Sequence, residues 1–287
     1  MHADQARAAG LDPLTFRDLA LDSGTGSSLF GVAPLPPRFS YSSLDTYERC
    51  PLQYAFSYVY RVPEPARPRA PLAFGSTAHE VFEAFTKERR ERLARGEPGP
   101  TREDLEQMFR SRWRPQAFGD KETEAAFGRK VGNLLENFWT GEVATASDAL
   151  AEEAKFTLVL DPGDGTPPVR IYGEIDRIDR LTSGGIEVVD YKTGNPQSQK
   201  SVHENLQLTI YALACRDALA LGTPERVTLY YTELGQRMST TRTDEQLDAA
   251  REELVARVRP IRAGAFHATP GAACRRCDYT AMCPERA

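Results

Sequence analysis

The period of the hydrophobic and polar positions changes near residue 154, and this change separates a helical part of the chain from a part that contains strands. Before that point apolar residues recur every three or four positions, which predicts amphipathic helices. These helices are expected at about 44–58, 76–95, 102–113 and 121–145, and Pro51 should break the first of them. After that point apolar and polar residues alternate, which predicts strands at 155–160, in the hairpin 172–194, and at 226–233 and 237–243, with helices at 203–221 and 244–262.

The order of these elements predicts an α/β fold in which a helical subdomain is attached to a small mixed sheet. The first 38 residues are rich in Ala, Gly, Ser and Pro and are expected to form a flexible arm with one short helix near 13–20. The remainder, 39–287, is expected to be a single domain. Its predicted parts are a mainly helical part, an α/β core and a cysteine-rich tail, over 39–150, 151–262 and 263–287.

The hairpin from Tyr172 to Gly194 has two carboxylates and an amine on its strands, namely Asp176, Asp190 and Lys192. Asp190 and Lys192 are two positions apart, so they project from the same face of an extended strand. A buried lysine beside acids is costly unless the charges compensate one another or bind a metal. The hairpin by itself is therefore compatible with a structural ion pair or with a metal site.

The turn of this hairpin decides whether Asp176 can meet Asp190. An even-numbered loop centred on Ser183-Gly184 would place Asp176 opposite Tyr191, on the wrong face of the sheet. Convergence of the two carboxylates requires an odd-numbered loop or a bulge. Because the apolar alternation shifts between Ile175 and Ile178, we expect a bulge near Asp176.

Composition and charge narrow the class of protein only slightly. With 40% hydrophobic and 27% charged residues, the chain has the composition of a soluble globular protein. It contains no apolar run of about 18 residues and no basic start followed by an apolar core, so we expect no membrane span and a cytoplasmic location. The net charge of −5 argues against a broad surface for polyanions, but local contacts with phosphate remain compatible with it.

Four of the five cysteines form a pattern typical of metal ligands. Cys274, Cys277 and Cys283 are clustered near the C-terminus, and Cys50 lies far upstream. In a cytosolic protein such clustering indicates a metal more often than a disulfide, and four thiolates suit zinc or an iron–sulfur cluster. Because a zinc ribbon would need a second CxxC, the pattern favours a [4Fe–4S] cluster, whereas free thiols in a loose tail are the alternative. Cys215 lies within an apolar helical run and is expected to be a core residue.

Two further pairs of polar residues share helix faces. His79 and Glu83 are one turn apart on one predicted helix, and Gln207 and Tyr211 are one turn apart on another. A lone histidine on a partly apolar helix is more often a packed or surface residue than a ligand, so neither pair indicates a site by itself.

Together these residues resemble the RecB/AddB branch of the PD-(D/E)XK nuclease superfamily. Four motifs in the expected order give the resemblance: Gly75-x3-His79, Gly173-x2-Asp176, Asp190-Tyr191-Lys192 and Gln207-x3-Tyr211. The cysteine set resembles the iron–sulfur ligands of AddB-type and CRISPR-associated RecB-like relatives, and the similarity spans about 40–284. The resemblance implies a restriction-endonuclease-like fold. It also implies a cluster that joins the two ends of the chain, so that loss of the metal should loosen the fold.

The resemblance also implies a role for each motif residue. His79, Asp176 and Asp190 would be side-chain ligands of Mg²⁺ or Mn²⁺, with the Tyr191 carbonyl as a further ligand. Lys192 would orient or deprotonate the attacking water or offset charge in the transition state. We prefer charge stabilisation and water orientation over proton abstraction for Lys192. Nearby carboxylates raise the pKa of a lysine, and a lysine acts as a base only if its pKa falls. The remaining implied residues are Gln207 and Tyr211, which would shape the site and contact DNA, and Glu83, which would lie beside the ligands.

The function implied is a metal-dependent DNA nuclease, most simply an exonuclease acting on duplex ends or single strands in DNA repair, recombination or a CRISPR-like pathway. The sequence contains no Walker A motif, so a helicase or repair-complex partner would have to be another protein or domain. Two alternatives from other classes are a non-catalytic iron–sulfur module that binds DNA and a metal-stabilised interaction domain. Cleavage by the wild type, and its loss in variants of Asp190 or Lys192, distinguishes the nuclease from both.

Overall fold

The computed structural model describes residues 35–65, 67–143 and 148–285, so most of the expected arm, including its short helix, lies outside the described residues. Its contacts group the chain into two compact units. The larger unit consists of 67–158 and 172–250, and the smaller unit consists of 1–66, 159–171 and 251–287. The single domain expected over 39–287 stays a prediction.

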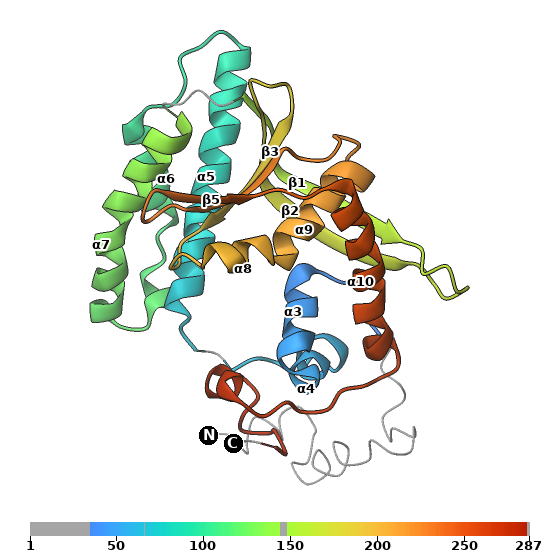
Figure 1. The fold of residues 1–287 in the computed structure, drawn as a ribbon. Helices are drawn as coiled ribbons and strands as arrows, with labels where there is room; N and C mark the ends of the chain where they lie inside the picture. Colours follow the sequence, from blue (N-terminus) through green and yellow to red (C-terminus); the bar gives the residue numbers. More distant parts are fainter. Residues whose placement is uncertain (1–34, 66, 144–147, 286–287) are drawn as a thin grey trace. The chain divides into compact units, whose positions relative to one another are not determined.

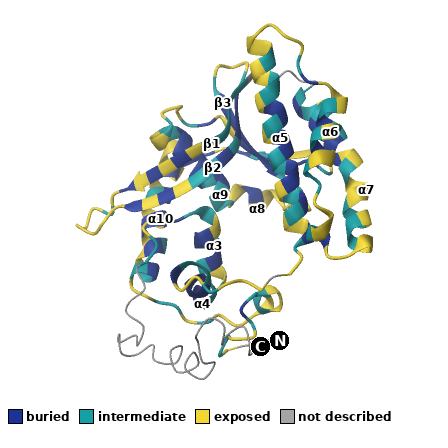
Figure 2. Ribbon diagram, turned by 180° about the vertical axis from the view of Figure 1, so that it is seen from behind, coloured by how far each residue is buried: buried dark blue, intermediate teal, exposed yellow. Residues whose placement is uncertain are grey.

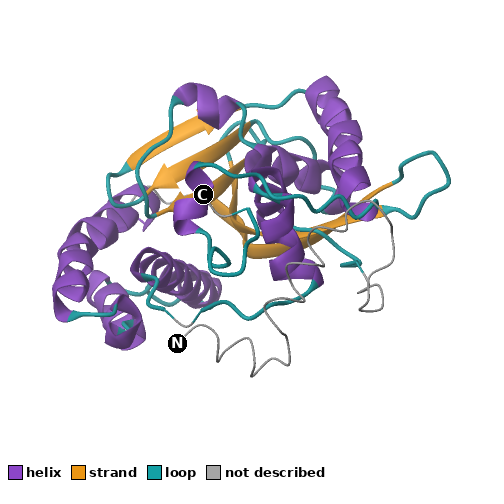
Figure 3. Ribbon diagram, turned by 90° about the horizontal axis from the view of Figure 1, so that it is seen from below, coloured by secondary structure: helices purple, strands orange, loops and turns teal. Residues whose placement is uncertain are grey.

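The strands form one five-stranded sheet in the order β1-β2-β3-β4-β5 (Figure 3). The strands are β1 (Asp148–Leu160), β2 (Val169–Arg180), β3 (Ile186–Lys192), β4 (Arg226–Tyr231) and β5 (Gln236–Thr240). β2 and β3 are antiparallel, β3 and β4 are parallel, and β4 and β5 are antiparallel. The parallel pair requires a crossover, which contains helices α8 (Gln199–His203) and α9 (Leu206–Leu213) and a π-helical turn (Ala214–Ala218). The mixed sheet flanked by helices confirms the predicted α/β class and is consistent with a restriction-endonuclease-like fold.

Three helices of the larger unit lie side by side against the sheet (Figure 1). They are α5 (Ala70–Ala94), α6 (Arg102–Arg112) and α7 (Lys121–Phe138), with a 3₁₀ turn (Pro115–Phe118) before α7 and a π-helical turn (Trp139–Val143) after it. Their apolar faces share one core with Val189, Tyr191 and Tyr230, and the rings of Phe82 and Phe138 stack with centroids 3.9 Å apart. α5 begins six residues before the predicted start, because Pro71 lies in the first turn, where a missing N–H costs no helical hydrogen bond.

The register of β2 and β3 shows that Asp176 and Asp190 lie on the same face of the sheet. Arg177 pairs with Val189 and Arg180 pairs with Ile186, so the five residues 181–185 form an odd-numbered loop. In this register the next opposite positions are Asp176 and Asp190, which project from the same face. The expected bulge near Asp176 is therefore not needed to bring the two carboxylates together.

Burial explains why the apolar alternation shifts. Ile175 and Ile178 point to opposite faces, and both are fully buried. β3 is buried over Ile186–Tyr191, as Figure 2 shows in dark blue, because helices cover both faces of the central sheet. A doubly covered strand needs apolar residues on both faces, so a break in alternation does not signal a bulge.

The smaller unit contains α3 (Tyr41–Arg49), α4 (Pro51–Tyr54), a π-helical turn (Ala55–Val59) and the 3₁₀ turn Ala272–Arg276. Pro51 begins a new helix, which confirms the predicted break. The N-cap of α3 is Ser40, which forms a capping box with Ser43.

α10 spans Asp244–Arg262, as predicted. The predicted helix 203–221 is interrupted instead at Asn205, whose side chain caps α9 by accepting from the Leu208 N–H. None of the described helices is long and apolar enough to cross a membrane.

Candidate metal centre

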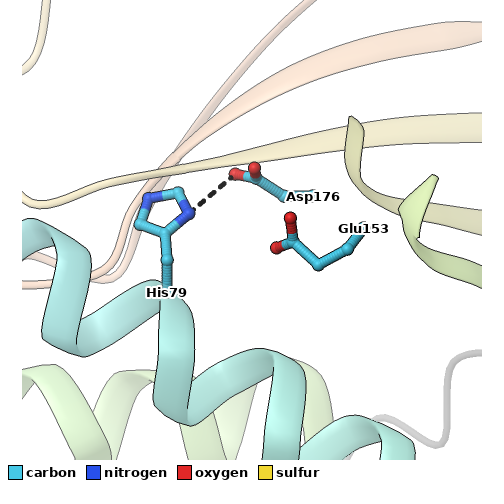
Figure 4. A group of neighbouring side chains, drawn as sticks. All are labelled: His79, Glu153 and Asp176. Carbon is cyan, nitrogen blue, oxygen red and sulfur yellow. Dashed lines mark ion pairs between the residues drawn. The ribbon is translucent and has the colours of Figure 1, made fainter. Parts of the chain in front are cut away.

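Three side chains from three elements of the larger unit point toward one another (Figure 4). His79 comes from the middle of α5, Glu153 from β1 and Asp176 from β2. Each offers one ligand atom, and these atoms all lie within 4.8 Å of one another. A nitrogen and two carboxylate oxygens in this arrangement are suitable ligands for a divalent cation.

The backbone of Tyr191 completes this group. Its N–H donates to Asp176 Oδ2 at 2.7 Å, and its carbonyl oxygen accepts from His79 Nε2 at 3.0 Å. Since a carbonyl can only accept, His79 Nε2 must be protonated in this arrangement. The carbonyl is thus already directed at the side chains that would share a cation with it.

The charge of His79 is set by its acidic neighbours. Burial by itself lowers the pKa of His79, but Asp176, whose Oδ2 lies 3.4 Å from His79 Nδ1, and Asp190 outweigh it and raise the pKa to about 9. A cation bound by His79 therefore competes with a proton for the imidazole.

Glu153 is absent from the predicted site residues, because the predicted strand begins at Lys155 whereas β1 begins at Asp148. Burial, followed by the charge of Asp176, raises the pKa of Glu153 to about 7. The only signal in the sequence is the acidic pair Glu152-Glu153 directly before the alternating pattern, and the pattern does not show which of the two faces the site. In the structure Glu152 is paired with Arg90 at 2.7 Å.

Asp190 and Lys192 form the second part of the site. Lys192 Nζ lies 2.5 Å from Asp190 Oδ2 and donates to Gln207 Oε1 at 3.0 Å. Asp190 is only 2% exposed, and this burial raises its pKa, whereas the charge of Lys192 opposes the rise. Gln207 in turn donates from Nε2 to the Tyr211 hydroxyl at 2.8 Å, so the two residues on α9 hold Lys192 in place. Burial and the two nearby aspartates raise the pKa of Tyr211 well above its usual value, which keeps the phenol neutral.

The glycines of two motifs are explained by close packing. A Cβ at Gly75 would lie 3.1 Å from Thr193 Oγ1, directly after the Asp-Tyr-Lys motif. A Cβ at Gly173 would lie 2.6 Å from the ring of Phe156, which packs edge-to-face on Tyr211 with centroids 6.1 Å apart. Both glycines therefore let neighbouring elements approach closely enough to position the site.

Glu83 lies beside the ligand group and does not belong to it. It lines an open pocket along α5 together with His79 and Glu153. Its charge contributes to the raised pKa of Glu153, after burial and the nearer carboxylates.

The cysteine set lies in the smaller unit. Cys50, Cys274, Cys277 and Cys283 line a single small pocket. Three of them pack against Leu52, Phe56 and Tyr279; these three are Cys50, Cys277 and Cys283. The pKa values of Cys277 and Cys283 are raised by burial and further by the charge of neighbouring thiols.

Hydrogen bonds within the smaller unit fix the cysteine-rich tail. The Leu52 N–H donates to the His267 carbonyl at 3.0 Å, which joins α4 to the tail. Thr280 Oγ1 contacts the carbonyls of Cys274 and Cys277 at 3.0 and 2.9 Å, and the Gly271 N–H donates to Cys274 Sγ at 3.4 Å. Cys215, by contrast, is fully buried in the larger unit, as expected for a core residue, and burial raises its pKa to about 12.

Comparison with known proteins gives one family. A model of the PD-(D/E)XK nuclease superfamily matches residues 38–284. No curated protein sequence matches the chain. Among solved structures, the crystal structure of SSO0001 is similar at 16% identity, over 75% of this chain and 96% of that one, with a TM-score of 0.32.

Proposed function

Because the chain belongs to the PD-(D/E)XK nuclease superfamily, we propose that it is a metal-dependent deoxyribonuclease of the RecB/AddB type that acts on DNA ends or single strands. The observation that supports this most is the backbone of Tyr191, whose N–H donates to Asp176 and whose carbonyl accepts from His79. Two motif residues, Asp176 and His79, thereby lie within hydrogen-bond distance of Tyr191, although the three residues belong to motifs that are far apart in the sequence.

The residues present fit a hard divalent cation. His79, Asp176, Asp190 and the Tyr191 carbonyl are the proposed ligands, a set rich in oxygen that suits Mg²⁺, with one imidazole that makes Mn²⁺ acceptable. When bound, such a cation activates water, neutralises the scissile phosphate and stabilises the leaving oxygen.

We assign Lys192 to charge stabilisation and not to proton abstraction. Its ammonium is 2.5 Å from Asp190 Oδ2, and a carboxylate so close favours the charged form of the amine. A lysine that stays charged can orient water and offset negative charge on the phosphate, but it cannot accept a proton. Gln207 acts as a positioning residue, since its amide binds both Lys192 and Tyr211.

The cysteine set is proposed to hold a [4Fe–4S] cluster. All four cysteines line one pocket. A zinc ribbon would need a second CxxC, so the single CxxC favours a four-iron cluster over one zinc ion.

The proposed setting is DNA repair, recombination or a CRISPR-like pathway, with a helicase or repair complex as partner. The support for this is the resemblance to RecB/AddB-type nucleases and the lack of a Walker A motif in the sequence.

The nuclease proposal is tested by incubating end-labelled single-stranded and duplex DNA, and RNA of the same sequence, with the wild type in Mg²⁺ or Mn²⁺. Progressive loss of nucleotides from DNA is expected, and Lys192→Ala should abolish it while leaving the Kd for DNA within a few-fold of the wild type. A matched control is Lys155→Ala, an exposed lysine paired with Glu174. Intact labelled ends with both metals would refute the proposal, and cleavage of RNA alone would refute the assignment to DNA.

The cluster proposal is tested on anaerobically purified protein by visible absorption and by iron, sulfide and zinc content. Four irons and four sulfides per chain are expected from the cluster type. Cys283→Ser should remove them and expose the tail to proteolysis at Arg275 and Arg276, whereas Cys215→Ala should not. Stoichiometric zinc without iron contradicts the proposal.

A further inference from the structure

We propose that Leu72, together with Pro71, forms an apolar platform for an unpaired DNA base. The inference rests on the proposed function in taking DNA as the substrate, and it goes further by naming residues that favour an unpaired nucleotide. Both residues lie in the first turn of α5, and the sequence motifs include neither of them.

The exposure of Leu72 is not a consequence of how α5 packs. Leu72 is 60% exposed, whereas Phe74 and Phe82 on the same helix are 0% and 1% exposed. The buried face of α5 is therefore a different one, and truncation of Leu72 should leave the core intact. Because single exposed leucines are common on proteins, the case for a ligand depends on where this one lies.

Leu72 lies on the same face of α5 as the proposed metal ligand His79. The two residues are seven positions apart, which is two helical turns, or roughly 10.5 Å along the axis. Gly75 and Ser76 lie between them on this face, three and four positions after Leu72. A glycine and a serine leave the surface low, and all four residues line the open pocket along α5.

The two ends of this pocket differ in chemistry. Pro71 and Leu72 line it at one end, and His79 and Glu153 line it at the other. A DNA strand has the same division, since its phosphates are charged and each base has a face that stacks. Nucleotides of a stacked strand are ~3.4 Å apart, so the roughly 10.5 Å from His79 to Leu72 spans about three of them. A strand with one phosphate at the metal ligands can therefore place a nearby base against Leu72.

Neutral donors line the pocket between its two ends. The exposed Ser76 and the residue after the Asp-Tyr-Lys motif, Thr193, both contribute hydroxyl groups. Ser and Thr hydroxyls are common partners of the phosphate and sugar groups of DNA. Glu80, which also lines the pocket, is paired with Arg114 at 3.0 Å, so its charge is offset.

An apolar platform suits an unpaired base better than a base pair. In a duplex the faces of each base are covered by its neighbours, so a side chain reaches them only when the base leaves the stack. Leu and Pro are among the apolar residues that proteins insert between base steps to unstack them. Stacking needs no hydrogen bond to a particular base. The substrate class inferred is therefore a single strand or a frayed duplex end of any sequence.

The test measures binding of the anaerobically purified full chain, in Ca²⁺ to limit cleavage, to a fluorescein-labelled single strand of mixed sequence and to the blunt duplex of that sequence. Leu72→Ala should raise the Kd for the single strand about 5-fold, and the Kd for the duplex less than about 2-fold. Leu72→Trp offers a larger stacking surface and should lower the Kd for the single strand. The matched control is Leu93→Ala, which truncates another exposed leucine of α5 and should change neither Kd.

A fully abasic strand of the same length isolates the contact with the base, because it keeps the sugars and phosphates. Leu72→Ala should bind this strand as tightly as the wild type does. Equal weakening by Leu72→Ala on the mixed-sequence and abasic strands, or on the single strand and the duplex, overturns the platform.

The outcomes separate this inference from the proposed function. If Leu72→Ala weakens binding of the single strand as expected but the wild type leaves DNA intact in Mg²⁺ and Mn²⁺, the nuclease function fails and the platform stands. If the wild type cleaves DNA and both Leu72 variants keep its Kd values, the platform fails and the nuclease function stands. A wild type that does not bind the single strand also overturns the platform.

Discussion

The backbone N–H of Tyr191 donates to Asp176 Oδ2 at 2.7 Å. β2 and β3 pair through their backbones from Arg177 to Arg180, and at the next position this side-chain bond is made. Asp176 therefore both fixes the backbone of β3 and presents a carboxylate to His79. The carbonyl of Tyr191, in the next peptide group, accepts from His79 Nε2 at 3.0 Å, so the backbone of this one residue contacts two of the proposed metal ligands.

Asp176→Asn separates these two roles. The amide oxygen can still accept from the Tyr191 N–H, so this hydrogen bond should survive, whereas cleavage should fall by roughly 100-fold or more. Mutation of a residue that only supports a metal ligand lowers metal affinity or activity about 10- to 100-fold. Mutation of a direct ligand should lower activity at least as much. Asp176→Ala also leaves the buried Tyr191 N–H unpaired, which should lower the free energy of unfolding, measured with urea, by a further ~1–3 kcal/mol. Equal stability of the Asn and Ala variants would show that the hydrogen bond has no structural role.

Arginine at position 192 distinguishes charge stabilisation from general-base catalysis. Arg keeps the positive charge but cannot lose a proton in proteins, whereas Met keeps only the length of the side chain. If Lys192 acts through its charge, Lys192→Arg should retain at least 10-fold more kcat/KM on DNA than Lys192→Met. Equal loss in the two variants, together with a wild-type rate that rises with pH, would instead assign proton abstraction to Lys192.

The packing of Gly173 against Phe156 predicts that Gly173→Ala is destabilising. The added Cβ would lie 2.6 Å from the Phe156 ring, so this ring must move toward Tyr211. Overpacking of this kind should lower the free energy of unfolding, measured with denaturant, by about 1–3 kcal/mol. Cleavage should also fall, because Tyr211 is hydrogen-bonded to Gln207. Gly128→Ala on α7 is the control, since nothing lies within 4 Å of its Cβ and it should stabilise by about 0.5–1 kcal/mol. A neutral Gly173→Ala would mean that Phe156 has free space.

Glu142 predicts how stability depends on pH. Burial raises its pKa to about 7, although Arg177, 3.0 Å away, and Arg237 oppose the rise. Because this pKa is higher in the folded than in the unfolded chain, the stability linked to this proton is fully present below about pH 4.5 and is lost as the pH rises through about 7. Glu142→Gln cannot ionise, so its stability relative to the wild type should improve by about 2 kcal/mol between pH 5 and pH 8. Urea unfolding at the two pH values measures this, and an unchanged difference would show that Glu142 is ionised throughout.

The sequence determined the type and order of most elements and the identity of the motif residues. α10 has its predicted bounds, and the break at Pro51 is where the sequence placed it, because periodicity and proline act within a few residues. The motif spacings were also sufficient to identify His79, Asp190 and Lys192 as candidates, although not to show that they meet.

Tertiary structure decided which of these groups converge. The odd-numbered loop sets Asp176 opposite Asp190, and the shift in alternation at Ile178 reflected burial on both faces of the sheet. Glu153 could not be recognised, because the sequence does not reveal that its backbone adopts φ = 45° while Glu152 is held by Arg90. Hydrophobic period is a local property, whereas strand register, backbone strain and pairing of charges depend on residues distant in the chain, and only the folded chain brings these together.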